Sequence, residues 1–257
     1  MTARICLAFA LLLVALPISS QEPPAPPEYF FLVASSVAQE DVPDWIDAMA
    51  LTAKAHAKHP EGHSWATYRE LTGGPGEAVR FFFPLNRLAE LDEWPSNRQV
   101  LTEILGKDRA RIALSDLDLA SDAAESIISY SSKMSRPWPD FQAPKYAWVE
   151  EVRVADGKMV QYAALAQRVV HAFDEHSGEG YWVVYGSAIG GDSSTLLWMY
   201  GFDQFAELDA WESRLAVLDK SMGEGEAGRL VAAMEAISES TSSIWQLEPA
   251  LSQFAGE

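Results

Sequence analysis

Hydrophobic and polar residues follow two periodicities along the chain, and their order predicts its secondary structure. A β-rich run at residues 29–37 precedes a helix at about 44–59, whose buried face recurs at spacings of four and three. Two further strands are predicted at 64–71 and 78–83. They flank a turn at 72–76, where paired glycines accept positive φ without strain.

The remainder of this unit is predicted to be helical and to close with a strand. Asn86 is expected to cap a helix that Pro95 interrupts and that ends near Gly106. A further helical piece is expected at 110–124, followed by a last strand at 125–134. The resulting order, β-α-β-β-α-β, is that of the ferredoxin-like split βαβ arrangement.

The same pattern occurs twice in the sequence. Residues 29–134 align with 146–251 without a gap, and 22 of the 106 aligned positions are identical. The identical pairs include aromatic and histidine residues: Tyr29 and Tyr146, His59 and His176, Trp65 and Trp182, Tyr68 and Tyr185. We therefore predict an internal duplication, each copy being large enough for a core of its own.

Proline-rich segments border the two copies, and an apolar segment precedes them. The predicted organisation is a signal peptide at 1–20, a proline-rich lead-in at 21–28, a first repeat at 29–134, a proline-rich linker at 135–144 and a second repeat at 145–257. The fold class expected from this order is α+β, with two tandem ferredoxin-like repeats.

The first twenty residues are typical of a secretory signal. Arg4 is followed by an apolar run at residues 5–16 and by a small-residue end, with cleavage expected after Ser20. The run is shorter than the roughly 20 residues that a membrane span needs. We therefore predict a periplasmic or secreted protein with no membrane contact after cleavage, although an uncleaved anchor is the alternative.

Composition and charge narrow the possible partners and chemistry. Hydrophobic residues make up 48% of the chain, enough for a buried core, and the formal net charge of −18 disfavours nucleic acid and anionic membranes as partners. Cys6, within the predicted signal, is the only cysteine. The mature chain is therefore predicted to contain no disulfide, thiolate metal site or cysteine nucleophile.

The first predicted helix differs from its copy on the face directed at the sheet. Where the second copy has Ala166, Val169 and Phe173, the first has an apolar, a hydroxyl and an imidazole side chain. The candidate ligand-binding residues are Met49, Thr52, His56, His59 and Trp65, with His176 and Trp182 from the second copy. The alternative is that Thr52 bonds its own helix backbone and that His56 reaches solvent.

Other candidate chemistry in the sequence has a structural explanation. His56, His59 and His63 have a metal-like spacing, but only one is shared by the copies, so we predict no metal and no cofactor. His59 near a helix end complements the dipole or acts as a pocket acid or base. Glu90 and Asp92 are expected to favour a helix start rather than to form a catalytic pair.

The spacing of the shared strand aromatics predicts where they point. Trp65 and Tyr68 are three residues apart on a strand, as are Trp182 and Tyr185, so the members of each pair face opposite sides of the sheet. One member of each pair should face the helices and the other should face the opposite side of the sheet. Core packing is the expected role of all four.

A short unit of this element order, with a histidine ending its first helix and a W-x-x-Y strand, resembles the dimeric α/β-barrel superfamily. Within it the sequence is most similar to NIPSNAP-like and antibiotic-biosynthesis-monooxygenase-like domains. The resemblance implies that the two repeats set their sheets face to face as one barrel, so that a single chain forms an intramolecular pseudo-dimer and remains monomeric.

The resemblance also implies three possible functions. The first is binding of a small, mostly apolar molecule between each sheet and its helices; the second is a cofactor-free oxygenase or isomerase; the third is a structural or interaction module with filled pockets. Haem binding occurs in the superfamily, but residues 110–124 and 227–241 contain no histidine, which disfavours a histidine-ligated haem.

Overall fold

The computed structural model describes residues 26–72, 78–137, 143–176, 180–210 and 214–254. The predicted signal peptide, the glycine pair after the second strand and Trp211 lie outside these residues. In the described part, the first half of the chain contains the following elements: β1 (Tyr29–Val37), α1 (Val42–Lys58), β2 (Ala66–Thr72), β3 (Ala78–Leu85), the 3-10 turn η1 (Leu88–Asp92), α2 (Asn97–Leu105), α3 (Lys107–Leu117) and β4 (Ala120–Tyr130).

The second half presents a closely similar order of elements: β5 (Tyr146–Val154), α4 (Met159–His176), β6 (Val183–Ile189), β7 (Thr195–Phe202), α5 (Ala206–Ala210), α6 (Arg214–Met222), α7 (Glu226–Glu235), β8 (Ser238–Leu247) and the 3-10 turn η2 (Pro249–Leu251). The protein is thus α+β, and its described strands and helices alternate as the hydrophobic pattern predicts.

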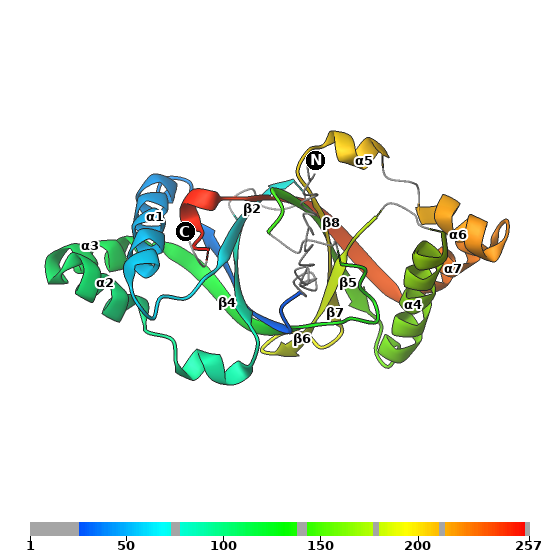
Figure 1. Cartoon of the computed structure of the whole chain (residues 1–257), viewed down its shortest axis with the longest axis horizontal. Helices are drawn as coiled ribbons and strands as arrows, with labels where there is room; N and C mark the ends of the chain where they lie inside the picture. The colour runs from blue at the N-terminus through cyan, green and yellow to red at the C-terminus, as the bar shows by residue number, and fades with distance from the viewer. Residues whose placement is uncertain (1–25, 73–77, 138–142, 177–179, 211–213, 255–257) are drawn as a thin grey trace, which may run out of the picture.

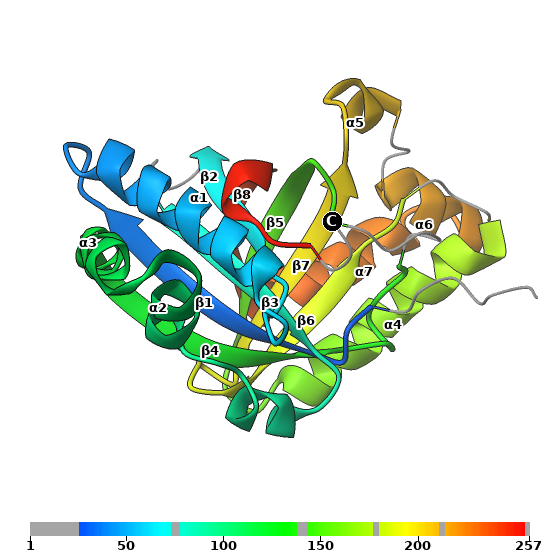
Figure 2. The same ribbon diagram turned by 60° about the vertical axis from the view of Figure 1, so that its left-hand side comes forward.

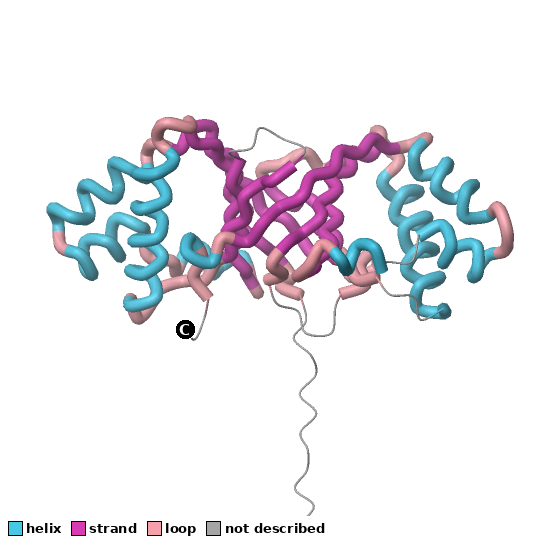
Figure 3. Tube along the Cα trace, turned by 90° about the horizontal axis from the view of Figure 1, so that it is seen from above, coloured by secondary structure: helices cyan, strands magenta, loops and turns pink. Residues whose placement is uncertain are grey.

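The eight described strands form one closed antiparallel barrel in the order β1-β3-β2-β8-β5-β7-β6-β4. The halves meet where β2 pairs with β8 and where β4 pairs with β6. Helices α1, α2 and α3 lie on one side of the barrel, and α4, α6 and α7 lie on the opposite side (Figures 1 and 3). Closure pairs every strand on both sides, which removes the exposed edges of an open sheet.

The barrel has an apolar interior that is distinct from the helix-facing layers. Alternate strand residues point inward, and this interior contains Leu32, Tyr68, Phe82, Tyr185 and Trp245. The predicted orientations of the shared aromatics are confirmed, because Trp65 and Trp182 pack with the helices while the two tyrosines lie inside the barrel.

The chain after the last strand of each half crosses to the other half. In the first half, the Trp65 indole Nε1 donates to the Leu251 carbonyl at 2.8 Å. In the second, the Trp182 Nε1 donates to the Met134 carbonyl at 2.7 Å. These two tryptophans therefore join the halves as well as filling the cores. In Figure 2 the end of the chain lies against the first half, beside α1.

The predicted boundaries of the last helix and strand were wrong. Residues 120–124 were expected to be helical, but they begin β4. The aligned strand of the second half, expected at 242–251 from the alignment, is β8 at Ser238–Leu247. Tertiary pairing decides the start of β4, because residues 120–124 pair with β1, which outweighs the helix preference of alanine.

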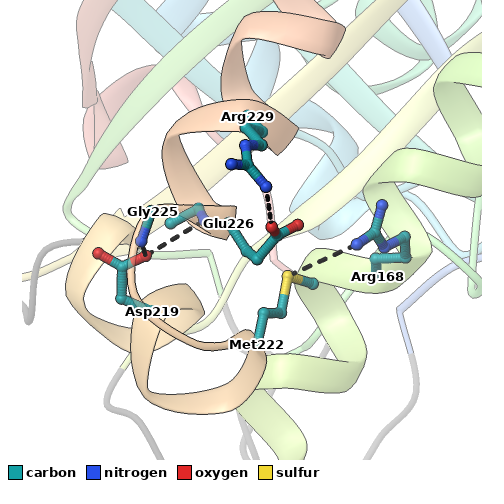
Figure 4. A network of polar contacts seen from close by, with 7 residues as sticks. Arg168, Asp219, Met222, Gly225, Glu226 and Arg229 are labelled. Carbon is teal, nitrogen blue, oxygen red and sulfur yellow. Dashed lines mark hydrogen bonds and ion pairs between the residues drawn. The ribbon is translucent and has the colours of Figure 1, made fainter.

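Short polar contacts close the ends of the helices. The Asp219 carboxylate, at the end of α6, accepts hydrogen bonds from the backbone of Gly225 and Ala227 at 3.1 and 3.2 Å, and so caps α7 (Figure 4). Arg229 forms an ion pair with Glu226 one turn away in the same helix. This layer is thus fixed by caps and packing, and Asp219 is a structural residue.

Candidate functional site

One end of the barrel contains an apolar cavity of about 330 Å³. Five residues of β1, β2 and β3 line it: Phe30, Ala66, Tyr68, Phe82 and Pro84. Five residues of β5, β6 and β7 line the facing wall: Ala147, Val183, Tyr185, Met199 and Gly201. Its volume is within the range of small-molecule sites, roughly 300–1,000 Å³.

The two walls of this cavity correspond position by position under the sequence alignment of the halves. Phe30 aligns with Ala147, Phe82 with Met199, and Tyr68 with Tyr185. Pro27 and Pro144 also align, and both lie at the rim. The cavity therefore lies between equivalent surfaces of the two halves, and the smaller Ala147 and the flexible Met199 leave more space on the second wall.

The polar groups of the cavity are few, and two of them have no hydrogen-bond partner among the described residues. The Tyr68 hydroxyl donates to the Pro144 carbonyl at 2.9 Å. The Tyr185 hydroxyl and the Gln253 side-chain oxygen are buried and unpartnered. Burial raises the pKa of both tyrosines above the ordinary value, so both hydroxyls remain protonated and able to donate.

All the described residues that line this cavity are uncharged. An ionised ligand would lose its hydration there without gaining a counter-charge, which is costly in an apolar site. Six aromatic side chains contribute to the lining: Phe30, Trp65, Tyr68, Phe82, Tyr185 and Phe254. The walls thus favour a neutral molecule that packs against rings.

Tyr185 separates this cavity from a second one at the other end of the barrel. The second cavity measures about 240 Å³ and includes charged side chains, among them Arg80, Glu151 and Asp192. The Arg80 guanidinium lies 5.7 Å from the centre of the Trp245 ring, so this end is partly filled by a cation–π contact. The apolar end is the better-formed candidate site.

The predicted site on the first helix is a packed core. Met49 is buried against the sheet, and the Thr52 hydroxyl donates to the Ala48 carbonyl at 2.8 Å, which is the backbone bond given as the alternative above. His56 is 1% exposed, so the accompanying expectation that it reaches solvent was wrong. Its Nε2 lies 3.0 Å from the Asn97 amide oxygen, and its Nδ1 is buried without a partner in the described chain.

The structure brings His63 into contact with His56, which the sequence did not single out as a packing pair. The two ring centres are 4.5 Å apart, and His63 stacks on Trp94 at 4.3 Å. Gly62 permits this turn of the chain, since a Cβ there would lie 1.9 Å from the His56 carbonyl oxygen. Burial, with a smaller contribution from His56, lowers the pKa of His63 to about 4.

The remaining predicted site residues are dispersed. His59 is buried, and its Nε2 lies 3.0 Å from the Glu103 carboxylate. His176 is exposed at the end of α4. Trp182 lines a cavity of about 190 Å³ between the helices and the sheet of the second half. Of the seven predicted residues, only Trp65 borders the apolar barrel cavity, and a ligand-binding role for the other six stays a prediction.

Two further observations concern chemistry that the sequence raised. Glu207 accepts hydrogen bonds from the backbone of Asp203 and Gln204 at 3.1 and 2.9 Å, and Glu90 accepts one from the Asn86 backbone at 3.4 Å, so these acids cap turns.

No group of three or more histidine, cysteine or acidic side chains in the described ranges is arranged to hold a metal. No helix of the described chain is long and apolar enough to cross a membrane.

The cavity was missed because the ligand was expected between each sheet and its helices, whereas the apolar hollow lies inside the barrel. Its residues did carry one signal in the sequence. The W-x-x-Y spacing places one aromatic residue of each pair on the face opposite the helices, and in the structure these are Tyr68 and Tyr185. Ala147 aligns with Phe30, and its small side chain leaves space in the cavity where the first half has a ring.

No family model matches the sequence, and no curated protein does so either. Several solved structures have a similar fold. A candidate monooxygenase from Lactobacillus acidophilus NCFM has a TM-score of 0.51 at 8% identity, covering 86% of this chain and 95% of that one. An anthrone oxidase-like protein has a TM-score of 0.52 at 13% identity, covering 90% and 94%.

A mutant chlorite dismutase from Candidatus Nitrospira defluvii is similar to the same degree, with a TM-score of 0.51 at 9% identity, covering 88% of this chain and 93% of that one. Such identities establish a shared fold and leave function open. The neighbours are monooxygenase-like and chlorite dismutase-like barrels, so the fold of this chain is that of the dimeric α/β-barrel proteins.

Proposed function

We propose that this chain is an exported protein whose barrel binds a small, largely apolar molecule. The cavity of about 330 Å³ at one end of the barrel is the observation that carries the proposal, because it is hollow, uncharged and lined with rings. A fold that needed only a packed interior would gain stability by filling this space.

Binding can be tested with diphenylmethane, a neutral hydrocarbon with two rings, by titration calorimetry and tryptophan fluorescence. Ala147→Met fills the cavity from the second wall and should weaken binding at least ten-fold. Val231→Met is the matched control, because Val231 lines the separate cavity beneath the helices of the second half. The proposal fails if the wild-type protein binds no diphenylmethane, or if only the control weakens binding.

A cofactor-free oxygenase or isomerase is the alternative function. It is supported by an apolar cavity that would exclude water from a bound substrate, and by the fold shared with a candidate monooxygenase. Anthrone is a suitable probe, given the anthrone oxidase-like neighbour. Oxygen uptake that requires the protein and is lost in Ala147→Met would favour the oxygenase. Anthrone binding without oxygen uptake would favour a protein that only binds its ligand. A structural module with filled pockets would give neither.

Export is part of the proposal and is supported by the sequence of residues 1–20. Amino-terminal sequencing of the exported protein should start at or near Gln21. A mature chain that starts at Met1 or Thr2 would exclude cleavage. After cleavage we infer a soluble protein that does not bind nucleic acid.

We also infer that the chain is a duplicated, NIPSNAP-like unit that functions as a single-chain pseudo-dimer. Support comes from the recurring element order and from the equivalent bonds of Trp65 and Trp182 across the halves. Light scattering after gel filtration should give the mass of one chain. A stable dimer of whole chains would contradict this inference.

A further inference from the structure

Tyr185 and Tyr68 occupy aligned positions on opposite walls of the barrel cavity, but their hydroxyls differ. The Tyr68 hydroxyl donates to Pro144 in the segment before β5. The aligned residue, Pro27, precedes β1 and also borders the cavity, yet the Tyr185 hydroxyl has no partner among the described residues. The tyrosine of the first half thus bonds to the segment that leads into the second half, whereas the tyrosine of the second half leaves a donor unused.

The Tyr185 side chain is held in place by its surroundings. It is 1% exposed, and the ring of Phe30 lies edge-on at 5.1 Å while the ring of Tyr130 lies at 5.7 Å. A fixed ring presents its hydroxyl in one direction without further loss of conformational entropy on binding. Leaving such a donor buried and unbonded costs roughly 1–3 kcal/mol, which an acceptor on a ligand would recover.

Tyr185 borders both barrel cavities, and the apolar one defines the rest of the ligand. The described lining of the apolar cavity is uncharged, which disfavours ions, and the rings of Phe30, Phe82 and Tyr68 suit an aromatic body. Gln253 carries the second unpartnered polar atom of the cavity, and its backbone is fixed by two hydrogen bonds to Trp65 at 2.8 and 3.0 Å. The fold therefore holds the Tyr185 ring by packing and the Gln253 backbone by hydrogen bonds.

We propose that Tyr185 is the polar anchor of the barrel cavity, and that its ligand is a neutral aromatic molecule with an oxygen that accepts a hydrogen bond. This inference rests on the proposed binding function and adds the chemical class of ligand. The Tyr185 O–H donates to a carbonyl or ether oxygen of the ligand, while the rings of the walls pack against its aromatic part.

The test compares benzophenone with diphenylmethane, which has nearly the same shape but no oxygen. Wild-type protein should bind benzophenone more tightly. Tyr185→Phe should weaken benzophenone binding roughly two- to ten-fold, the value of one neutral hydrogen bond, and leave diphenylmethane binding unchanged. Tyr68→Phe is the matched control and should leave the affinity ratio of the two probes unchanged.

The outcomes separate the two proposals. Equal affinity of the wild-type protein for both probes, together with no effect of Tyr185→Phe, overturns the anchor but retains apolar binding. Absence of binding by either probe overturns both proposals. Loss of both affinities in Tyr185→Phe, with the melting temperature unchanged, would mean that Tyr185 shapes the cavity rather than donating.

The position of the ligand can be mapped with the same probe. Irradiated benzophenone inserts into nearby C–H bonds, and the label should fall on Met199, which lines the apolar cavity. A label on Leu197 or Thr195 would place the ligand in the charged cavity at the other end of the barrel and would overturn the assignment.

Discussion

The helix-facing core of the first half contains imidazoles where that of the second half contains hydrocarbon and a guanidinium. His56 aligns with Phe173, and His63 aligns with Gly180. In the first half His63 packs on His56 and Trp94, whereas in the second the Arg136 guanidinium lies 5.9 Å from the Phe173 ring centre. Equivalent positions in one architecture thus tolerate different chemistry, provided that the volume is filled.

A second contrast lies inside the barrel, where the same tyrosine is bonded in one half and unbonded in the other. The helix-facing difference is compensated by packing, because His56 still bonds Asn97 and His63 still stacks. The difference at Tyr185 has no such compensation among the described residues and borders an apolar cavity. The comparison therefore shows differences with packing or hydrogen-bond partners in the helix-facing layers and an unpartnered hydroxyl in the barrel interior.

Separation of the halves is the most severe test of this comparison. Residues 22–140 expressed alone should not form a folded monomer, because Phe30, Tyr68 and Phe82 would lose the facing wall, and β2 and β4 would lose a neighbour. Analytical ultracentrifugation and urea unfolding measure this. A monomeric fragment with cooperative unfolding would refute the dependence of one half on the other.

Removal of the two bridging tryptophans should be next in magnitude. Trp65→Ala and Trp182→Ala should each cost about 3–5 kcal/mol in unfolding free energy, since each loses a buried ring and an indole hydrogen bond to the other half. Denaturant melts provide the measurement. If one variant lost less than about 1 kcal/mol in unfolding free energy and the other lost about 3–5 kcal/mol, the two positions would not be equivalent.

The histidine-rich core should make stability depend on pH. Between pH 6.5 and about 4 the unfolded chain binds a proton that folded His63 does not, so the free energy of unfolding should fall as pH falls through this window. The contribution should be roughly 1–3 kcal/mol after allowance for partial exposure, and it should level off below about pH 4. Urea melts at successive pH values give the slope.

His63→Phe should flatten this slope, because a phenyl ring can keep the stacking on Trp94 without titrating. His176→Gln is the control, because His176 is exposed at the end of α4. If both variants retain the wild-type slope, the pH dependence arises elsewhere in the chain.

The smallest expected effect is that of His56→Phe, which copies the second half. It removes a buried, unpartnered Nδ1 and a bond to Asn97, whose exposed amide can bond water instead. Stability should be unchanged or rise by about 1 kcal/mol, with benzophenone binding intact. If His56→Phe lost benzophenone binding at an unchanged melting temperature, the face of α1 that carries His56 would be a ligand site after all.

The local chemistry of the sequence predicted most of the elements correctly. Spacings of four and three placed α1, and the spacing of Trp65 and Tyr68 placed them on opposite faces of their strand. The structure decided that Trp65 faces the helices and Tyr68 the barrel interior. Prediction failed at residues 120–124, where alanines favour a helix in isolation. Pairing with β1 bonds the backbone of this segment and overrides that preference.

The sequence by itself determined the periodicity of each strand and helix and the recurrence of the pattern, because the periodicity depends on neighbours within a few residues and the recurrence is written in the chain itself. Only the tertiary structure decided which inward faces meet, and hence where a hollow remains. The space beside Ala147 and the unbonded hydroxyl of Tyr185 arise when two slightly different walls close on one another. A cavity depends on the fit between distant surfaces, and no local pattern specifies that fit.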